Sequence, residues 1–204
     1  GEIHDYTRKG GVESAELVLP AGAPEWAADR AALWNAAEQA ETRKNSTVAR
    51  EFEIALPEEL SPAERARLAR DFARELVERH GCAADVCIHA PGKDGDDRNH
   101  HAHILMTTRR LEPSGELGEK TRELDDVKRG PQEVEWVRAM IEARTNHALE
   151  RAGSAARVDR RSLVEQRAAA LEAGDQERAA ELDRLPTIHE GPRVTAIRRE
   201  CERE

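Results

Sequence analysis

The chain has 204 residues, of which 36% are charged, 38% hydrophobic and 3% aromatic, and its formal net charge is −9. This length suits one domain, or one domain with a tail, built on a modest core. No apolar run approaches the roughly 18 residues that a membrane span needs, and no secretory signal is visible. The three cysteines lack zinc-site spacing and are odd in number, so we expect a cytoplasmic protein without a disulfide framework or membrane insertion.

The first half of the chain predicts alternating strands and helices. Residues 2–19 have an extended pattern, and residues 24–43 carry apolar side chains at helical spacing. Residues 47–56 alternate between apolar and polar, as in a strand with one buried face. Residues 61–80 start with serine, proline and a glutamate three positions after the serine, which together indicate the beginning of a helix.

The second half predicts two more strands and then helices. The strands are expected over 85–90 and 100–108, joined by a polar loop, and residues 110–130 have an irregular, charged pattern. A helix is expected over 131–152, and short helical pieces follow it. This order predicts an α+β fold, in which an antiparallel sheet has helices on one face and an open metal- and DNA-binding face. We expect residues 1–153 to form the core and residues 154–204 a C-terminal helical extension or tail.

Four histidines in and beside the last two strands are the strongest signal of a site. His101 and His103 project from one face of a strand, one pleat apart, and His89 lies near the end of the strand before it. Three imidazoles with open remaining positions could hold Mg²⁺ or Mn²⁺, with Zn²⁺ or Ni²⁺ as alternatives. His100 should point the other way. The competing interpretation is a solvated, histidine-rich strand edge.

The strand over 47–56 adds two carboxylates to the same face. If Phe52 packs beneath the helices, Glu51 and Glu53 face the open side with the histidines. Either carboxylate could orient a metal-bound imidazole, ligate the ion or act as a base. We slightly favour Glu53, and the alternative is a pair of solvent-facing glutamates.

Charge alone argues against a nucleic-acid partner, because phosphate contacts need lysine and arginine. Acidic residues, however, concentrate in the stretches expected to be helical, and basic residues occur in pairs elsewhere. The sequence is therefore also consistent with a local basic groove on an acidic protein. The candidate DNA contacts are Arg43, Lys44, Arg109, Arg110 and Lys120.

A series of motifs extends over most of the chain. In chain order they are Arg50–Pro57, Ile88–Ala90, His101-Ala102-His103 with the following Ile104–Thr107, Asn146–Gly153, Arg157–Leu163 and Pro186–Pro192. Together they resemble the MobA/MobL relaxases of the HUH endonuclease superfamily. Two departures accompany this resemblance: Arg160 stands where many relatives have histidine, and residues 167–184 look like an insertion.

The resemblance implies a reaction on DNA. In this family a tyrosine hydroxyl attacks one phosphodiester at a plasmid origin of transfer, giving a 5′-phosphotyrosyl link and a free 3′-hydroxyl. The three-histidine metal grips the phosphate and stabilises the transition state. The implied partners are single-stranded or origin DNA, accessory mobilisation proteins and a coupling protein.

The nucleophile is the point of departure from the family. The family's tyrosine lies in an N-terminal segment after a first strand, and neither is visible here. Tyr6 is the only tyrosine, and the stretch around it resembles a downstream family segment. The chain also begins at Gly1 without methionine. We therefore expect a relaxase fragment that lacks its nucleophile segment and is inactive by itself, with Tyr6 kept as a candidate nucleophile.

Three rival functions remain. The histidine-triad nucleotide hydrolases also use a histidine-rich strand, but their pattern needs another histidine at the position of Leu105. The second rival is a non-catalytic module that binds single-stranded DNA or a metal. The third is a purely structural metalloprotein.

Overall fold

The computed structural model describes residues 11–91, 98–186, 194 and 201. Its contacts divide the chain into two units, Gly1–Val158 and Asp159–Glu204, five residues beyond the expected boundary at 153. The difference has a local cause. The Asn146 side-chain amide donates to the Val158 carbonyl (2.9 Å) and accepts from the Val158 N–H (2.8 Å), which ties the segment after the last long helix to the first unit.

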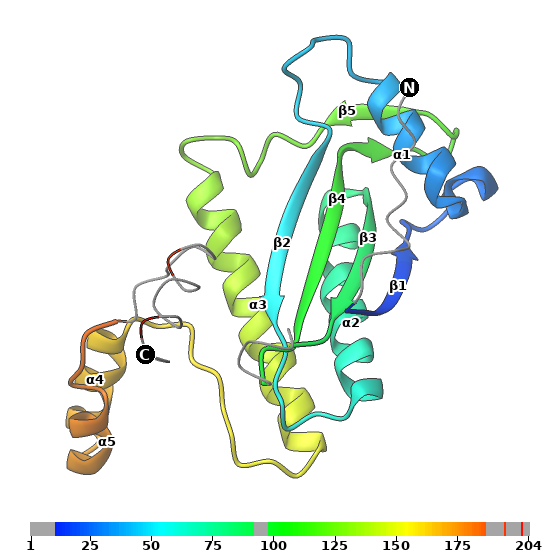
Figure 1. The fold of residues 1–204 in the computed structure, drawn as a ribbon. Helices are drawn as coiled ribbons and strands as arrows, with labels where there is room; N and C mark the ends of the chain where they lie inside the picture. The colour runs from blue at the N-terminus through cyan, green and yellow to red at the C-terminus, as the bar shows by residue number, and fades with distance from the viewer. Residues whose placement is uncertain (1–10, 92–97, 187–193, 195–200, 202–204) are drawn as a thin grey trace. The chain divides into compact units, whose positions relative to one another are not determined.

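The first unit is built on an antiparallel sheet, as the strand pattern predicts (Figure 1). Its strand order is β1-β3-β4-β2, and β5 pairs with the end of β4. Two strand predictions need correction. The third strand starts three residues before the expected Asp85, and β5 forms inside the stretch expected to be irregular. The strands are β1 (Val12–Val18), β2 (Ala49–Ala55), β3 (Cys82–His89), β4 (His101–Leu111) and β5 (Leu117–Lys120).

Two long helices, α2 (Pro62–His80) and α3 (Gly130–Arg151), cover one face of this sheet. The predicted start of α2 is confirmed, because Ser61 and Glu64 form a reciprocal capping box. The helix ends at Gly81, whose φ of 67° lies in the left-handed region that glycine adopts without a steric penalty. Phe72 of α2 is fully buried against the inward side chains of the sheet and forms the centre of the main core.

Among the described residues, helix α1 (Arg30–Gln39) and the turn before it cover the opposite face at one end only. The expected helix over 24–43 is divided at Asp29 into this 3-10 turn (Glu25–Ala28) and α1. The break occurs because the Asp29 carboxylate accepts the Ala32 N–H and caps a new helix. Leu33 of α1 packs with Ala83 in a second, smaller core. The open face is therefore the end of the sheet away from α1.

The second unit is a small helical hairpin, in agreement with the predicted helical extension. Its helices α4 (Leu163–Glu172) and α5 (Gln176–Glu181) pack around Ala170, Ala179 and Leu182. Among the described helices, none is long and apolar enough to cross a membrane.

Candidate metal centre

Three histidines converge on the open face of the sheet. His89 of β3 and His101 of β4 are direct cross-strand partners, and His103 follows one pleat along β4. The ring centroids lie 4.7 Å apart for His89 and His103, 5.3 Å for His89 and His101, and 5.2 Å for His101 and His103. One possible ligand atom from each residue lies within 4.8 Å of the other two. The geometric prediction of one shared point is met.

The hydrogen bonds of two rings fit a metal site. His101 Nδ1 lies 2.9 Å from the Asn99 carbonyl oxygen, and His103 Nδ1 lies 2.7 Å from Glu51 Oε1. A carbonyl oxygen or a carboxylate can only accept, so each Nδ1 must carry the hydrogen. In the neutral form of each ring, Nε2 is then the nitrogen that keeps the lone pair. Holding one ring nitrogen by a carbonyl or a carboxylate is the usual way in which proteins orient histidine for a metal.

Glu51 is the carboxylate that reaches the cluster, so the slight preference for Glu53 was wrong. Glu53 stands directly opposite His103 in the register, whereas Glu51 is the diagonal neighbour, opposite Leu105. A long side chain can bridge such a diagonal. Among the described residues, no hydrogen bond joins Glu53 to these histidines. Phe52 lies on the other face, half-buried against the main core, as expected.

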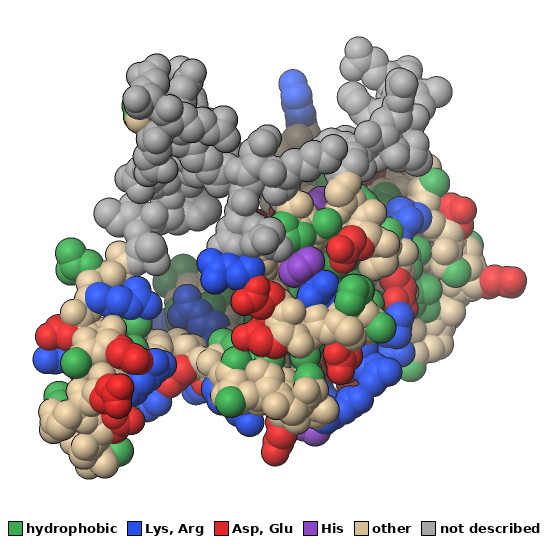
Figure 2. Space-filling model, turned by 60° about the horizontal axis from the view of Figure 1, so that its bottom comes forward, with side chains coloured by type: hydrophobic (Ala, Val, Ile, Leu, Met, Phe, Trp, Pro, Cys, Tyr) green, Lys and Arg blue, Asp and Glu red, His purple; other side chains and the backbone are tan. Residues whose placement is uncertain are grey.

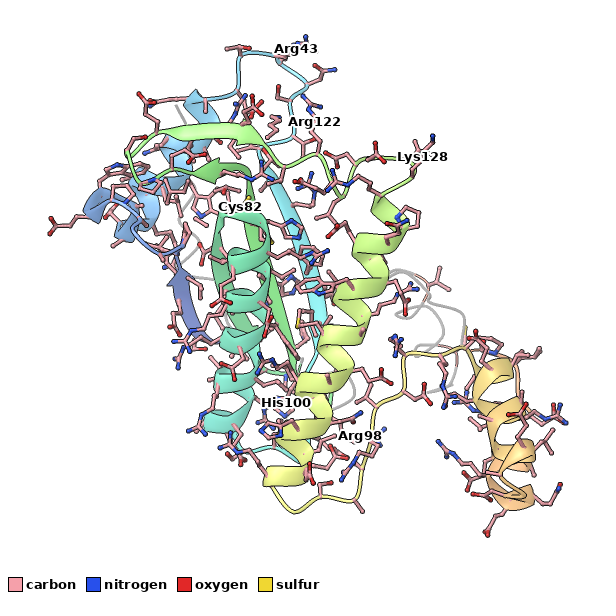
Figure 3. The ribbon with its side chains drawn as sticks, turned by 180° about the vertical axis from the view of Figure 1, so that it is seen from behind. Arg43, Cys82, Arg98, His100, Arg122 and Lys128 are labelled. Carbon is pink, nitrogen blue, oxygen red and sulfur yellow. The ribbon has the colours of Figure 1, made fainter. Side chains whose placement is uncertain are left out.

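His100 faces away from the three histidines, as its position in the strand predicts. It lies on the helix-covered side of the sheet, beside α3 (Figure 3). Its carbonyl oxygen accepts the Leu56 N–H at 2.8 Å. Its Nδ1 is buried, with no hydrogen-bond partner among the described residues. His100 therefore belongs to the packing beneath the site. Figure 2 views this end of the molecule, where histidine side chains reach the surface between acidic and basic ones.

Three of the five candidate DNA-binding cations are engaged in ion pairs. Arg109 and Lys120 both bind the Glu41 carboxylate, at 2.9 and 2.7 Å. Burial raises the pKa of Glu41, but the hydrogen bonds from Lys120 and Arg109 outweigh it and hold that pKa below its ordinary value. Arg110 pairs with Glu123. These cations hold the loop before β2 and the segment after β5 against the sheet.

The other two candidates are exposed. Arg43 and Lys44 lie in the loop between α1 and β2 and form no ion pair within the described part of the chain. Figure 3 places Arg43 at one end of the first unit, with Arg122 and Lys128, and His100 at the other end of that unit. The basic candidates therefore do not surround the histidines. Tyr6 lies outside the described residues.

Comparison with known proteins settles the family. A sequence model of the MobA/MobL family matches residues 1–200. The chain belongs to the MobA/MobL family. It is 37% identical to mobilization protein MobL of Acidithiobacillus ferridurans over all of its own length and 56% of that protein. It is 32% identical to a probable mobilization protein MobA of Bifidobacterium longum, with 98% of this chain and 38% of that protein covered.

A solved structure shares this fold. A chain described under "Molecular Basis of Vancomycin Resistance Transfer in Staphylococcus aureus" is 33% identical, with a TM-score of 0.66 over 78% of this chain and 79% of that one. The sheet with its covering helices is thus the fold of a related protein. This MobA/MobL chain spans about half, or less, of the two mobilization proteins that it matches.

Proposed function

We propose that this MobA/MobL chain is the metal-binding part of a relaxase, which nicks one DNA strand at a plasmid origin of transfer during conjugative mobilisation. The observation that carries the proposal is the convergence of His89, His101 and His103, with two of the three rings oriented through Nδ1. Family membership supplies the substrate class. We place the protein in the cytoplasm, with origin DNA, accessory mobilisation proteins and a coupling protein as partners.

The residues divide the chemistry between them. Nε2 of His101 and His103, with the His89 ring, would hold a divalent ion, Mg²⁺ or Mn²⁺ first and Zn²⁺ or Ni²⁺ as alternatives. A bound ion would polarise a non-bridging phosphate oxygen and offset the negative charge that the phosphate oxygens carry in the transition state. Glu51 keeps the His103 ring in the ligating tautomer. We do not assign the role of general base to Glu51 or Glu53, because no described contact places either carboxylate beside a nucleophile.

Strand cleavage also needs an oxygen nucleophile. In the proposed reaction a tyrosine hydroxyl attacks phosphorus, the bond to the 3′-oxygen breaks, and the proton passes from the phenol to the departing 3′-oxygen. The protein keeps the 5′-phosphate as a phosphotyrosyl ester, so the strand can be rejoined. Tyr6 is the only tyrosine of the chain, and the resemblance assigns its stretch to another family segment. We therefore propose that this chain binds without cleaving.

The proposed DNA path is electrostatic in origin. Arg43 and Lys44 are exposed and available to phosphates. The other three candidates, Arg109, Arg110 and Lys120, are ion-paired to glutamates, so we expect them to shape the surface near the DNA and not to bind phosphates directly. Each phosphate contact on a single strand should contribute roughly −0.7 to the slope of log K against log salt. Replacing Arg43 and Lys44 by glutamine should flatten that slope. An unchanged slope would remove these two residues from the path.

The test of the proposal is a labelled origin oligonucleotide, incubated with the protein and Mn²⁺ or Mg²⁺ and run on a denaturing gel. We expect metal-dependent binding that His101→Ala and His103→Ala abolish, and no covalent protein–DNA band. A covalent band that disappears in Tyr6→Phe would show that Tyr6 is the nucleophile. A protein joined to the family's N-terminal tyrosine segment should form the band, and Tyr→Phe in that segment should remove it.

A non-catalytic module that binds single-stranded DNA or a metal is the second candidate. The position of the single tyrosine in a different motif favours it. Binding without a covalent band, even after the tyrosine segment is joined, would decide for this alternative.

A further inference from the structure

Two side chains of α1, one aromatic and one cationic, are held on the face of β3 that carries His89. Going from α1 toward the metal centre, the residues on this face are Ala83, Asp85, Cys87 and His89, because side chains of a strand alternate. Asp85 is buried, and its two carboxylate oxygens hold two side chains of α1. Arg30 donates to Oδ2 through Nε (2.8 Å) and to Oδ1 through an NH2 group (3.1 Å). Trp34 donates to Oδ2 through Nε1 (3.1 Å).

The direction of this pair follows from the contacts of α1. Leu33 packs with Ala83, which is the residue of this face farthest from the metal centre. Trp34, the next residue of the helix, bonds to Asp85, one pleat nearer to His89. Trp34 therefore reaches one pleat farther along this face toward His89 than Leu33 does. Asp85 and His89 are four residues apart, or roughly 13 Å along the strand.

Both Arg30 and Trp34 keep part of their side chains exposed to solvent. The Arg30 side chain is 46% exposed although its guanidinium is held by a carboxylate that is only 9% exposed. Trp34 is partly exposed as well, with its indole N–H satisfied by Asp85. Leu105, partly exposed, pairs with Asp85 across the sheet and lies one pleat from His103. An aromatic side chain at Asp85 and the apolar side chain of Leu105 therefore lie on the same face of the sheet as the metal centre.

We propose that Trp34, held by Asp85 and flanked by Arg30, stacks on a base of the single strand whose phosphate lies at the three histidines. This inference rests on the proposed function and deepens it by naming a nucleotide subsite. Every base has an aromatic face, so an indole can hold a strand without reading its sequence. Because Asp85 fixes the indole before DNA arrives, little side-chain freedom is lost on binding. Arg30 lies beside the indole and is partly exposed, and its ion pair with Asp85 offsets its charge.

The experiment compares two probes: a short oligothymidine, and a backbone of the same length that lacks bases. Binding of both is measured by fluorescence anisotropy with Mn²⁺ present. Trp34→Ala should weaken oligothymidine binding by about 5–100-fold, the range expected for one stacked base. It should leave binding of the base-free backbone unchanged. Trp34→Phe should retain most of the affinity, because a smaller aromatic ring can still stack.

Trp136→Phe is the matched control. Trp136 lies in α3, where Arg79 stacks on its ring at 4.2 Å and the main core lies beneath it. This variant should bind both probes as the unaltered chain does. Thermal melting and Mn²⁺ affinity of the Trp34 variants show whether the fold and the metal centre are intact. If Trp34→Ala does not fold, Trp34→Leu takes its place: it keeps an apolar side chain but cannot stack, and it should lose oligothymidine affinity while binding the base-free backbone as before.

The outcomes distinguish a failure of the stacking subsite from a failure of the proposed function. If Trp34→Ala binds oligothymidine as tightly as the unaltered chain while His101→Ala does not bind, the stacking subsite is wrong and the proposed function stands. Equal losses on both probes would also overturn the subsite, since the lost contact would not involve a base. If the unaltered chain binds neither probe, the subsite and the proposed function fall together.

Discussion

Removing the Glu51 carboxylate should weaken metal binding without unfolding the protein. Glu51 Oε1 lies 2.7 Å from His103 Nδ1, and this bond fixes the tautomer that leaves Nε2 free to ligate. Loss of such an orienting carboxylate costs roughly 10–100-fold in metal affinity. The Glu51 side chain is 54% exposed, so water can replace part of the interaction. We therefore expect Glu51→Ala to fall near the lower end, about tenfold, or about 1.4 kcal/mol.

The assay is isothermal titration of Mn²⁺ into the purified protein at neutral pH. Glu53→Ala is the matched control, because Glu53 has the same charge, the same strand and the same face, but no hydrogen bond to the histidines in the described structure. Glu51→Gln should lie between Glu51→Ala and the unaltered protein, since its amide oxygen can still accept from Nδ1. An unchanged affinity in Glu51→Ala, or an equal loss in Glu53→Ala, would refute this reasoning.

Three further predictions concern the metal and the stability of the fold. Excess divalent metal should raise the melting temperature of the unaltered protein through binding to the native state, and should not do so in His101→Ala; equal shifts would place the ion elsewhere. Burial lowers the pKa of His80 below its ordinary value of 6.5. The unfolded chain therefore binds a proton at this residue before the folded chain does, and the free energy of unfolding should fall as pH decreases below about 6.5. Urea titrations should show a flatter pH dependence in His80→Gln, and parallel curves for the variant and the unaltered protein would count against this assignment. Phe72 is fully buried, so Phe72→Ala should reduce the free energy of unfolding by about 3–5 kcal/mol. Ser61→Ala at the helix cap should reduce it by at most about 2 kcal/mol, and equal effects of the two changes would be inconsistent with the core described.

Local patterns were sufficient for the elements that depend on local chemistry. The helix α2 could be predicted because its capping box and its apolar stripe both lie within the helix or beside it. The convergence of the three histidines could be predicted because strand alternation fixes which side chains share a face. In both cases the sequence separation that matters is short, or the register is the simplest one available.

Features that depend on distant partners could not be predicted. The choice of Glu51 over Glu53 depends on the pairing of β2 with β4, whose register no local pattern determines. The packing of α1 on the second face depends on Asp85, which lies 55 residues from Arg30. Similarly, Arg109 and Lys120 share Glu41, 68 and 79 positions away in the chain, so basic pairs that look available in the sequence are ion-paired in the fold.

The alternation of β4 couples two properties that mutation could otherwise alter separately. Ala102, Ile104 and Met106 point into the main core, while His101 and His103, in the same strand, point to the metal centre. Inserting or deleting one residue in this strand would exchange the two faces, placing imidazoles in the core and aliphatic side chains at the surface. A single insertion or deletion would therefore destabilise the core and remove the histidines from the metal centre at the same time. Length variation compatible with a working protein should therefore be confined to the connections between strands, and β4 itself should change only by substitution.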